Sequence, residues 1–206
     1  IPAVKNWAYR RNIRLTLRPS GSGFQMGFVG HDKESLIQVK DCSIFSSQKD
    51  QILPNVAAII EKLSCRKENS GSVVILRSQA NKFVLHCSFE KEIPANFLKV
   101  ANDAVQENSS FSGGSASCRG QNQSVGNPKA SFELLHGLEI QCSPRAFVQN
   151  HPDQSLRIYE DVRDLLTQNK AERILDLYCG IGCLSLVLAS AGLKIHGVEN
   201  NPAAVK

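Results

Sequence analysis

Residues 174–183, Ile-Leu-Asp-Leu-Tyr-Cys-Gly-Ile-Gly-Cys, decide the fold of this chain of 206 residues. The first half of the stretch is a short apolar strand. Gly180 and Gly182 then permit a tight turn into a helix and the close approach of a ligand to the backbone. A second apolar strand is expected over residues 194–199 and ends on Glu199. Strand, glycine turn, helix and strand in this order predict the start of a doubly wound α/β domain.

Two ligands fit a turn of this kind. A dinucleotide rests its pyrophosphate on the helix N-terminus and usually requires a third glycine, but Ser185 stands at that position. Asp176 beside the turn attracts the sulfonium and ammonium of S-adenosylmethionine, although an aspartate there can also simply cap the turn. Glu199 lies where a carboxylate can accept the hydroxyls of a ribose. The motif therefore favours S-adenosylmethionine over a dinucleotide.

The region before this motif has the pattern of an α+β domain with an antiparallel sheet. Alternating or apolar runs predict strands at 12–18, 24–29, 35–39, 72–76, 82–89, 132–135 and 138–141, and helical spacing predicts helices at 49–64, 94–105 and 153–168. Asp153 is the expected cap of the last helix. Residues 107–130 hold almost no large apolar side chains, which predicts a flexible loop. We divide the chain into domains at 1–142 and 143–206.

Charge and cysteine content narrow the functional classes. The net charge is +5, and five basic residues precede the first acidic one: Lys5, Arg10, Arg11, Arg14 and Arg18. Such a cluster is either a solvated face or a strand that faces a phosphate backbone. The seven scattered cysteines and the absence of a secretory signal predict a reducing, cytoplasmic setting. No apolar run reaches the roughly 20 residues that span a bilayer, and the sequence implies no obligate protein partner.

Both ends of the chain are unusual for a complete protein. Residue 1 is Ile, the only methionine is Met26, and the last residues read as a helix start with Asn201 as cap and Pro202 in the first turn. We interpret the chain as an internal piece of a longer protein.

Three stretches together resemble the RNA 5-methyluridine methyltransferases. They are residues 7–15 (Trp-Ala-Tyr-Arg-Arg-Asn-Ile-Arg-Leu), residues 143–150 (Ser-Pro-Arg-Ala-Phe-Val-Gln-Asn), and Asp-Leu-Tyr-Cys-Gly-Ile-Gly at 176–182 with Gly-Val-Glu at 197–199. The resemblance implies a central RNA-binding α+β domain followed by the start of a Rossmann-like S-adenosylmethionine-dependent methyltransferase domain. The implied cofactor-binding residues are Gln149, Tyr178, Gly180 and Glu199, to which the electrostatic argument adds Asp176. Arg145 and Phe147 would face an RNA base taken out of its stack.

The same resemblance suggests a metal ligand. Residues 39–44, Val-Lys-Asp-Cys-Ser-Ile, are similar to the segment that supplies one cysteine to a [4Fe–4S] cluster in the ribosomal-RNA branch, so Cys42 is a candidate ligand. The other three ligands would precede Ile1. A lone cysteine is otherwise an ordinary core residue.

The implied reaction forms 5-methyluridine in 23S ribosomal RNA. A cysteine thiolate would add to carbon 6 of the uracil and activate carbon 5 as a nucleophile. The family places this cysteine and the base after the position of Lys206, so we assign no catalytic residue here and expect the chain alone to be inactive.

Other functions remain open at this level. The resemblance also allows a transfer-RNA uracil methyltransferase or a truncated, non-catalytic RNA-binding relative. A small-molecule methyltransferase is disfavoured by the long α+β region with its basic start. A nicotinamide-dependent oxidoreductase is disfavoured by Ser185 and Asp176.

Overall fold

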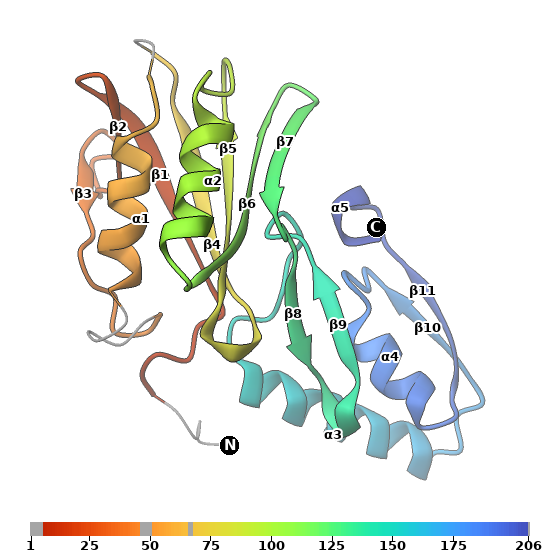
Figure 1. Ribbon diagram of the computed structural model, residues 1–206. Coiled ribbons are helices and arrows are strands. Elements are labelled where there is room, and N and C mark those ends of the chain that lie inside the picture. Colours follow the sequence, from red (N-terminus) through yellow and green to blue (C-terminus); the bar gives the residue numbers. More distant parts are fainter. Residues whose placement is uncertain (1–5, 46–50, 66–67, 206) are drawn as a thin grey trace.

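The computed structural model describes residues 6–45, 51–65 and 68–205, and its largest element is a seven-stranded sheet in the order β3-β2-β1-β4-β5-β6-β7 (Figure 1). The strands are β1 (Asn12–Ser20), β2 (Gly23–Val29), β3 (Leu36–Gln38), β4 (Gly71–Arg77), β5 (Phe83–Phe89), β6 (Phe111–Cys118) and β7 (Gln121–Gly126). All neighbouring strands are antiparallel except β5 and β6, which are parallel. The fold is therefore mixed α/β with a mostly antiparallel sheet.

Two helices cover one face of this sheet, α1 (Ile52–Glu61) and α2 (Phe97–Glu107) (Figure 1). Alternation along β1 sends Ile13, Leu15 and Leu17 into the core beneath them and leaves Arg14 on the opposite face. Pro54 lies in the first turn of α1, where its missing N–H leaves no helical bond unmade. The strands and helices expected between residues 12 and 105 are thus present, except that residues 49 and 50 of the helix predicted over 49–64 lie outside the described residues.

The predicted flexible loop at 107–130 is wrong. Residues 111–118 and 121–126 form β6 and β7, and α2 carries the chain from β5 to β6 as a crossover between parallel strands. Glycine is needed where β6 and β7 meet, because a Cβ on Gly113 would lie 2.2 Å from the Asn127 carbonyl oxygen and one on Gly126 would lie 2.6 Å from the Ser112 carbonyl oxygen. A stretch of Gly, Ser and Ala therefore marks tight packing and not disorder.

A second core joins the sheet to the C-terminal part of the chain. It contains Leu76 and Val84 from the large sheet, Phe132 from the hairpin of β8 (Ala130–Glu133) and β9 (Glu139–Cys142), Tyr159 from α3 (Pro152–Gln168), and Val187 from α4 (Cys183–Ser190). Short 3₁₀ turns at Gln79–Asn81 and Leu135–Gly137 complete the connections.

The start of α3 differs from the expectation in one respect. His151, and not Asp153, is the N-cap: its ring Nδ1 accepts a hydrogen bond from the backbone N–H of Gln154 at 3.4 Å. Pro152 occupies the first helical position, which places Asp153 inside the first turn. Tyr9 stacks on the His151 ring with a centroid distance of 4.5 Å and so fixes this helix end to the N-terminal segment.

The last elements are β10 (Arg173–Leu177), β11 (Lys194–Val198) and α5 (Pro202–Val205). Strands β10 and β11 pair in parallel, with Asp176 opposite Gly197. Asn201 caps α5 as expected, since its side chain accepts a hydrogen bond from Ala203 N at 3.0 Å. No helix among the described residues is long and apolar enough to cross a membrane.

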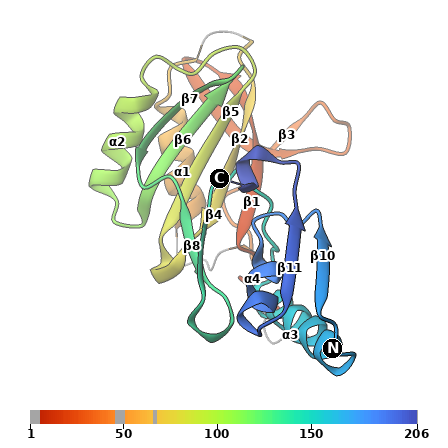
Figure 2. The ribbon, with the colours of Figure 1, turned by 90° about the vertical axis from the view of Figure 1, so that its right-hand side faces the viewer.

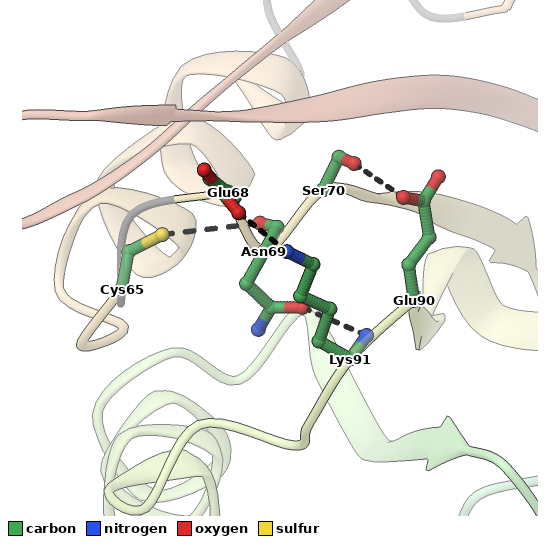
Figure 3. Close-up of polar contacts among 6 residues, drawn as sticks. All are labelled: Cys65, Glu68, Asn69, Ser70, Glu90 and Lys91. Carbon is green, nitrogen blue, oxygen red and sulfur yellow. Dashed lines mark hydrogen bonds and ion pairs between the residues drawn. The ribbon is translucent and has the colours of Figure 1, made fainter.

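A buried asparagine ties the entry of β4 to the exit of β5 (Figure 3). Asn69 is 2% exposed; its Nδ2 donates to the Glu92 carbonyl at 2.9 Å, and its Oδ1 accepts from Lys91 N at 3.2 Å. At the surface, Ser70 donates to the Glu90 carboxylate at 2.6 Å, and Lys91 pairs with Glu68 at 2.7 Å. The carboxamide thus satisfies two backbone groups where the two strand ends meet.

Candidate cofactor site

The glycine turn between β10 and α4 forms the centre of the candidate site. Gly180 and Gly182 have φ values of 59° and 82°, and a Cβ on either would meet nothing within 4 Å. Both glycines therefore expose backbone in a conformation that L-residues rarely adopt. Figure 2 shows β10 and β11 running side by side toward α5, to the lower right of the large sheet. In open parallel sheets, ligands bind at this carboxyl end of the strands.

Glu199 closes the turn from the end of β11. One carboxylate oxygen accepts a hydrogen bond from Gly180 N at 2.7 Å, and the other accepts from Asn200 N at 2.8 Å and Asn201 N at 2.7 Å. The backbone N–H groups of Asn201 and Gly180 are the main reason that the pKa of Glu199 lies below its ordinary value. A carboxylate has about four acceptor positions, so three bonds leave room for one ribose hydroxyl. To accept both hydroxyls, as the sequence suggested, Glu199 would have to release a backbone N–H.

Asp176 lies under the turn and is held by α4. Its Oδ2 accepts a hydrogen bond from the Ser185 hydroxyl at 2.6 Å. Ser185 stood out in the sequence only as the residue in place of a third glycine, and its role as the partner of Asp176 was missed. Gly197 leaves room for the Cys179 side chain over β11, since a Cβ there would lie 2.9 Å from Cys179 Sγ.

Tyr178 has the backbone conformation of a strained residue. Its φ is 59°, which is unusual for a bulky side chain, and the side chain is 80% exposed. Strain of this kind concentrates at functional sites, where it costs about 1–3 kcal/mol per residue. Tyr178 is thus presented to solvent beside the turn, where an aromatic wall would lie.

Gln149 comes from a different segment, between β9 and α3, and is exposed. Its neighbour Val148 is buried in the second core, which also holds Val187 of α4 and contacts Ile181 of the glycine turn. Phe147 is 67% exposed, and Arg145 Nη1 donates to the Asn122 Oδ1 of β7 at 3.1 Å. The structure therefore groups four of the predicted residues at the carboxyl ends of β10 and β11: Asp176, Tyr178, Gly180 and Glu199. Gln149 lies on the segment before α3, which packs beside the glycine turn.

A cavity of about 630 Å³ opens beside the turn. It is lined by the glycine turn, by α4, by β11 with Glu199, and by Ala204 and Val205 of α5. Its volume lies within the usual range of about 300–1,000 Å³ for ligand sites. Gly180 and Glu199 line it, whereas Asp176, Tyr178 and Gln149 are not among its lining residues.

The cysteines near the turn are not activated. All seven cysteines are free thiols. Burial raises the pKa of Cys183, and partial burial together with the carboxylates of Asp176 and Glu199 raises that of Cys179. The thiolate is the nucleophilic form, so these positions do not suit a nucleophile at neutral pH.

Cys42 lies in the segment that follows β3, an edge strand of the large sheet. It is partly buried against the main core, and no group of three or more His, Cys, Asp or Glu suited to a metal ion occurs within 6–45, 51–65 and 68–205. Ala8 N donates to the Ser43 carbonyl at 2.7 Å, and Arg10 N donates to the Ile44 carbonyl at 2.8 Å. The described N-terminal segment therefore runs beside Cys42.

Comparison with known proteins gives concordant matches, although no protein-family model matches the chain. The chain is 35% identical, over 99% of its length, to an uncharacterised RNA methyltransferase of Protochlamydia amoebophila, of which it covers 46%. It is 27% identical over 97% of its length to the 23S rRNA (uracil(1939)-C(5))-methyltransferase RlmD of Salmonella choleraesuis, of which it again covers 46%. The chain thus spans about half the length of the curated relatives it matches.

A solved structure shares the fold. The tRNA (uracil-54, C5)-methyltransferase of Pyrococcus abyssi, in complex with S-adenosyl-L-homocysteine, superposes with a TM-score of 0.76 at 17% identity. The match covers 100% of this chain and 52% of that chain.

Proposed function

Because this chain belongs to the family of RNA uracil-C5 methyltransferases, we propose that it binds S-adenosylmethionine at the glycine turn and forms part of an enzyme that methylates carbon 5 of a uracil in RNA. The observation that carries the proposal is the hydrogen bond from Gly180 N to Glu199. This bond places the Glu199 carboxylate, which can accept a ribose hydroxyl, against the exposed backbone of the glycine turn at the carboxyl ends of two parallel strands.

The proposed roles follow from these positions. Glu199 accepts a ribose hydroxyl, and the exposed backbone of Gly180 lies against the ligand. Tyr178 supplies an aromatic wall, Asp176 attracts the positive charge of the methionyl part, and Gln149 approaches from the segment before α3. Bound S-adenosylmethionine supplies an electrophilic methyl group.

The reaction replaces the hydrogen on carbon 5 of the uracil with this methyl group, and the hydrogen leaves as a proton. The raised pKa values of Cys179 and Cys183 argue against these two thiols as the nucleophile, and from the family resemblance we propose that the nucleophilic cysteine lies outside this chain. The 206-residue chain alone is therefore expected not to turn over.

We extend the proposal to the domain organisation. Residues 1–142 would form the central RNA-binding domain, with the large sheet as its framework, and residues 143–206 the first part of a Rossmann-like methyltransferase domain. The parallel pairing of β10 and β11 around the glycine turn supports the second assignment. The shared core of Leu76, Val84 and Val187 would hold the two domains together.

A [4Fe–4S] cluster with Cys42 as one ligand fits the chemistry of a soft thiolate. The hydrogen bonds of Ala8 and Arg10 with residues 43 and 44 support it, because they bring the N-terminal segment next to Cys42. The full-length protein, purified without oxygen, should contain about four iron atoms per chain. A Cys42→Ser variant should lose iron, whereas Cys118→Ser should keep it.

For the substrate we propose ribosomal RNA in the cytoplasm, since RlmD, at 27% identity over 97% of the chain, is named for 23S rRNA. The test uses full-length protein and RNA with tritium on carbon 5 of its uracils. Release of tritium that depends on S-adenosylmethionine is the expected result, with ribosomal RNA fragments reacting faster than transfer RNA. A faster reaction with transfer RNA would instead identify transfer RNA as the substrate.

The same experiment separates the competing functions. Binding of S-adenosylhomocysteine without tritium release from either RNA would indicate a non-catalytic relative. Binding of NAD in place of S-adenosylhomocysteine would overturn the proposal. A stable adduct with RNA that contains 5-fluorouracil would support covalent catalysis, because fluorine cannot leave as a cation after the methyl transfer.

A further inference from the structure

The face of β1, β4, β5, β6 and β7 opposite α1 and α2 has an unusual composition, and we name it the polar sheet face. The pairing register places side chains from all five strands on it. Its hydroxyl groups come from Thr16, Ser72, Ser88, Ser115, Ser117 and Ser124. Within the strand ranges given above, this face carries no aspartate or glutamate.

In the described part of the chain, the second core covers one end of the polar sheet face, and Val74 and His86 in its middle are also buried. Leu76 and Val84 are buried in the second core, beneath the elements that lead to α3 and α4. Further along the same strands the hydroxyl side chains are half-buried or exposed. The face thus begins next to the C-terminal part of the chain and opens to solvent away from it.

A histidine organises the centre of this face. His86 is 2% exposed, with Nδ1 2.8 Å from Ser115 Oγ and Nε2 3.1 Å from Ser117 Oγ. A neutral imidazole donates through one nitrogen and accepts through the other. The serine that accepts from the ring therefore keeps its own hydroxyl proton for another partner. Burial, followed by the charges of Arg145 and Arg14, lowers the pKa of His86 to about 4.

Two arginines approach His86 and its serine partners from opposite sides of the polar sheet face. Arg14 projects from β1, two strands away from His86 in the register Arg14–Val74–His86. Arg145 reaches in from the segment after β9 and is oriented by its hydrogen bond with Asn122 on β7. Arg18, further along β1, donates instead to the backbone carbonyls of Lys33 and Glu34. The register and the hydrogen bonds therefore identify Arg14 and Arg145 as the cations next to His86 and its serine partners.

We propose that the polar sheet face is the surface on which the RNA backbone lies, with its phosphates between Arg14 and Arg145 and hydrogen bonded to the serine hydroxyls around His86. Arginine forks and hydroxyl donors are the groups that bind phosphate oxygens. Within its strands this face carries no carboxylate, which gives the charge complementarity that a polyanion needs; Glu90, just past β5, is hydrogen bonded to Ser70.

The position of Arg145 connects this surface to the candidate site. It lies two residues before Phe147 and four before Gln149, on the segment that packs beside the glycine turn. An RNA strand held on the polar sheet face would thus be directed toward the cofactor. This inference rests on the proposed function and names the part of the chain that holds the substrate.

The test measures RNA affinity of the full-length protein as a function of salt concentration, with an RNA that the native protein methylates. Arg14→Ala and Arg145→Ala should each bind several-fold more weakly, and the slope of log K against log salt should fall by about 0.7 for each lost contact with a single strand. Lys99→Ala is the matched control, because Lys99 is exposed on α2 on the other side of the sheet. Arg14→Lys should restore most of the salt slope, since a lysine keeps the charge.

Binding of S-adenosylhomocysteine to each variant provides the second measurement. The proposal requires that Arg14→Ala and Arg145→Ala lose RNA affinity and keep native affinity for S-adenosylhomocysteine. If both variants bind RNA like Lys99→Ala while the native protein methylates it, the polar sheet face is not the RNA surface and the proposed function stands. If the native protein binds neither RNA nor S-adenosylhomocysteine, both proposals fail.

Discussion

The carboxylate of Glu199 accepts the backbone N–H of Gly180 at 2.7 Å and so joins the end of β11 to the turn after β10. The same carboxylate accepts the N–H groups of Asn200 and Asn201 and fixes the entry to α5. One side chain therefore sets the shape of the candidate site before any ligand is bound.

Replacing Glu199 with Gln should weaken binding of S-adenosylhomocysteine about 10- to 100-fold. The amide loses the negative charge and turns an NH₂ group toward backbone donors, and hydrogen bonds to a charged group contribute about 1.5–3 kcal/mol. Calorimetric titration of the full-length protein measures the effect. The control is Glu172→Gln, an exposed position before β10. Equal affinities of the two variants would remove Glu199 from the site.

Gly180→Ala should abolish most ligand binding at a small cost in stability. Gly180 has a φ of 59° and open space around the position of a Cβ, so the alanine costs about 1–2 kcal/mol of backbone strain and projects a methyl group into the ligand's place. Gly192→Ala is the control, because Gly192 has a φ of 84°, equally open space, and lies after α4, away from the turn. Urea unfolding should show similar losses for both variants, and only Gly180→Ala should lose ligand. Retained binding in Gly180→Ala would contradict close backbone approach.

The pH dependence of stability should contain a contribution from His86. Its pKa is lowered from 6.5 to about 4 in the folded protein, mainly by burial. The folded protein favours neutral His86, whereas the unfolded chain binds the proton more readily. The contribution of His86 to the free energy of unfolding is therefore complete above pH 6.5 and is lost as the pH falls toward 4. The loss amounts to about 3 kcal/mol at 1.36 kcal/mol per pKa unit. Unfolding by urea between pH 7.5 and 4.5 should therefore show a steeper decline for the native protein than for His86→Gln. Parallel curves would mean that His86 does not titrate in this way.

Asn69→Ala should lower the free energy of unfolding by about 2–3 kcal/mol. The variant leaves the Glu92 carbonyl and the Lys91 N–H without their buried partner, and each such group costs about 1–3 kcal/mol. Ser70→Ala removes only the surface bond to Glu90, and the expected loss is within about 0.5 kcal/mol. Chemical denaturation compares the two. A similar small loss in both would show that water replaces the Asn69 contacts.

The sequence predicted the framework of the fold because the apolar and polar residues of most strands and helices repeat with a regular spacing over a few neighbouring positions. Alternation along residues 12–18 predicted β1, and the apolar run before Gly180 predicted β10 and its turn. The same approach failed at 107–130, since Gly and Ser lack the large apolar side chains that mark a strand. Those residues form strands because β5 offers a parallel partner, and the glycines at 113 and 126 let the backbones of β6 and β7 approach closely. The cap of α3 was misplaced by two residues because His151 is a rare cap.

By itself, the sequence determined the glycine turn, the acidic residues beside it and the basic residues of β1, because their identities are chemical and their spacing is local. Only the tertiary structure decided what these groups contact. It placed Glu199 against Gly180 and Ser185 against Asp176. It also brought Arg145 into a hydrogen bond with Asn122 on the polar sheet face. These contacts join residues from different elements, so they exist only once the sheets are paired and the second core is packed.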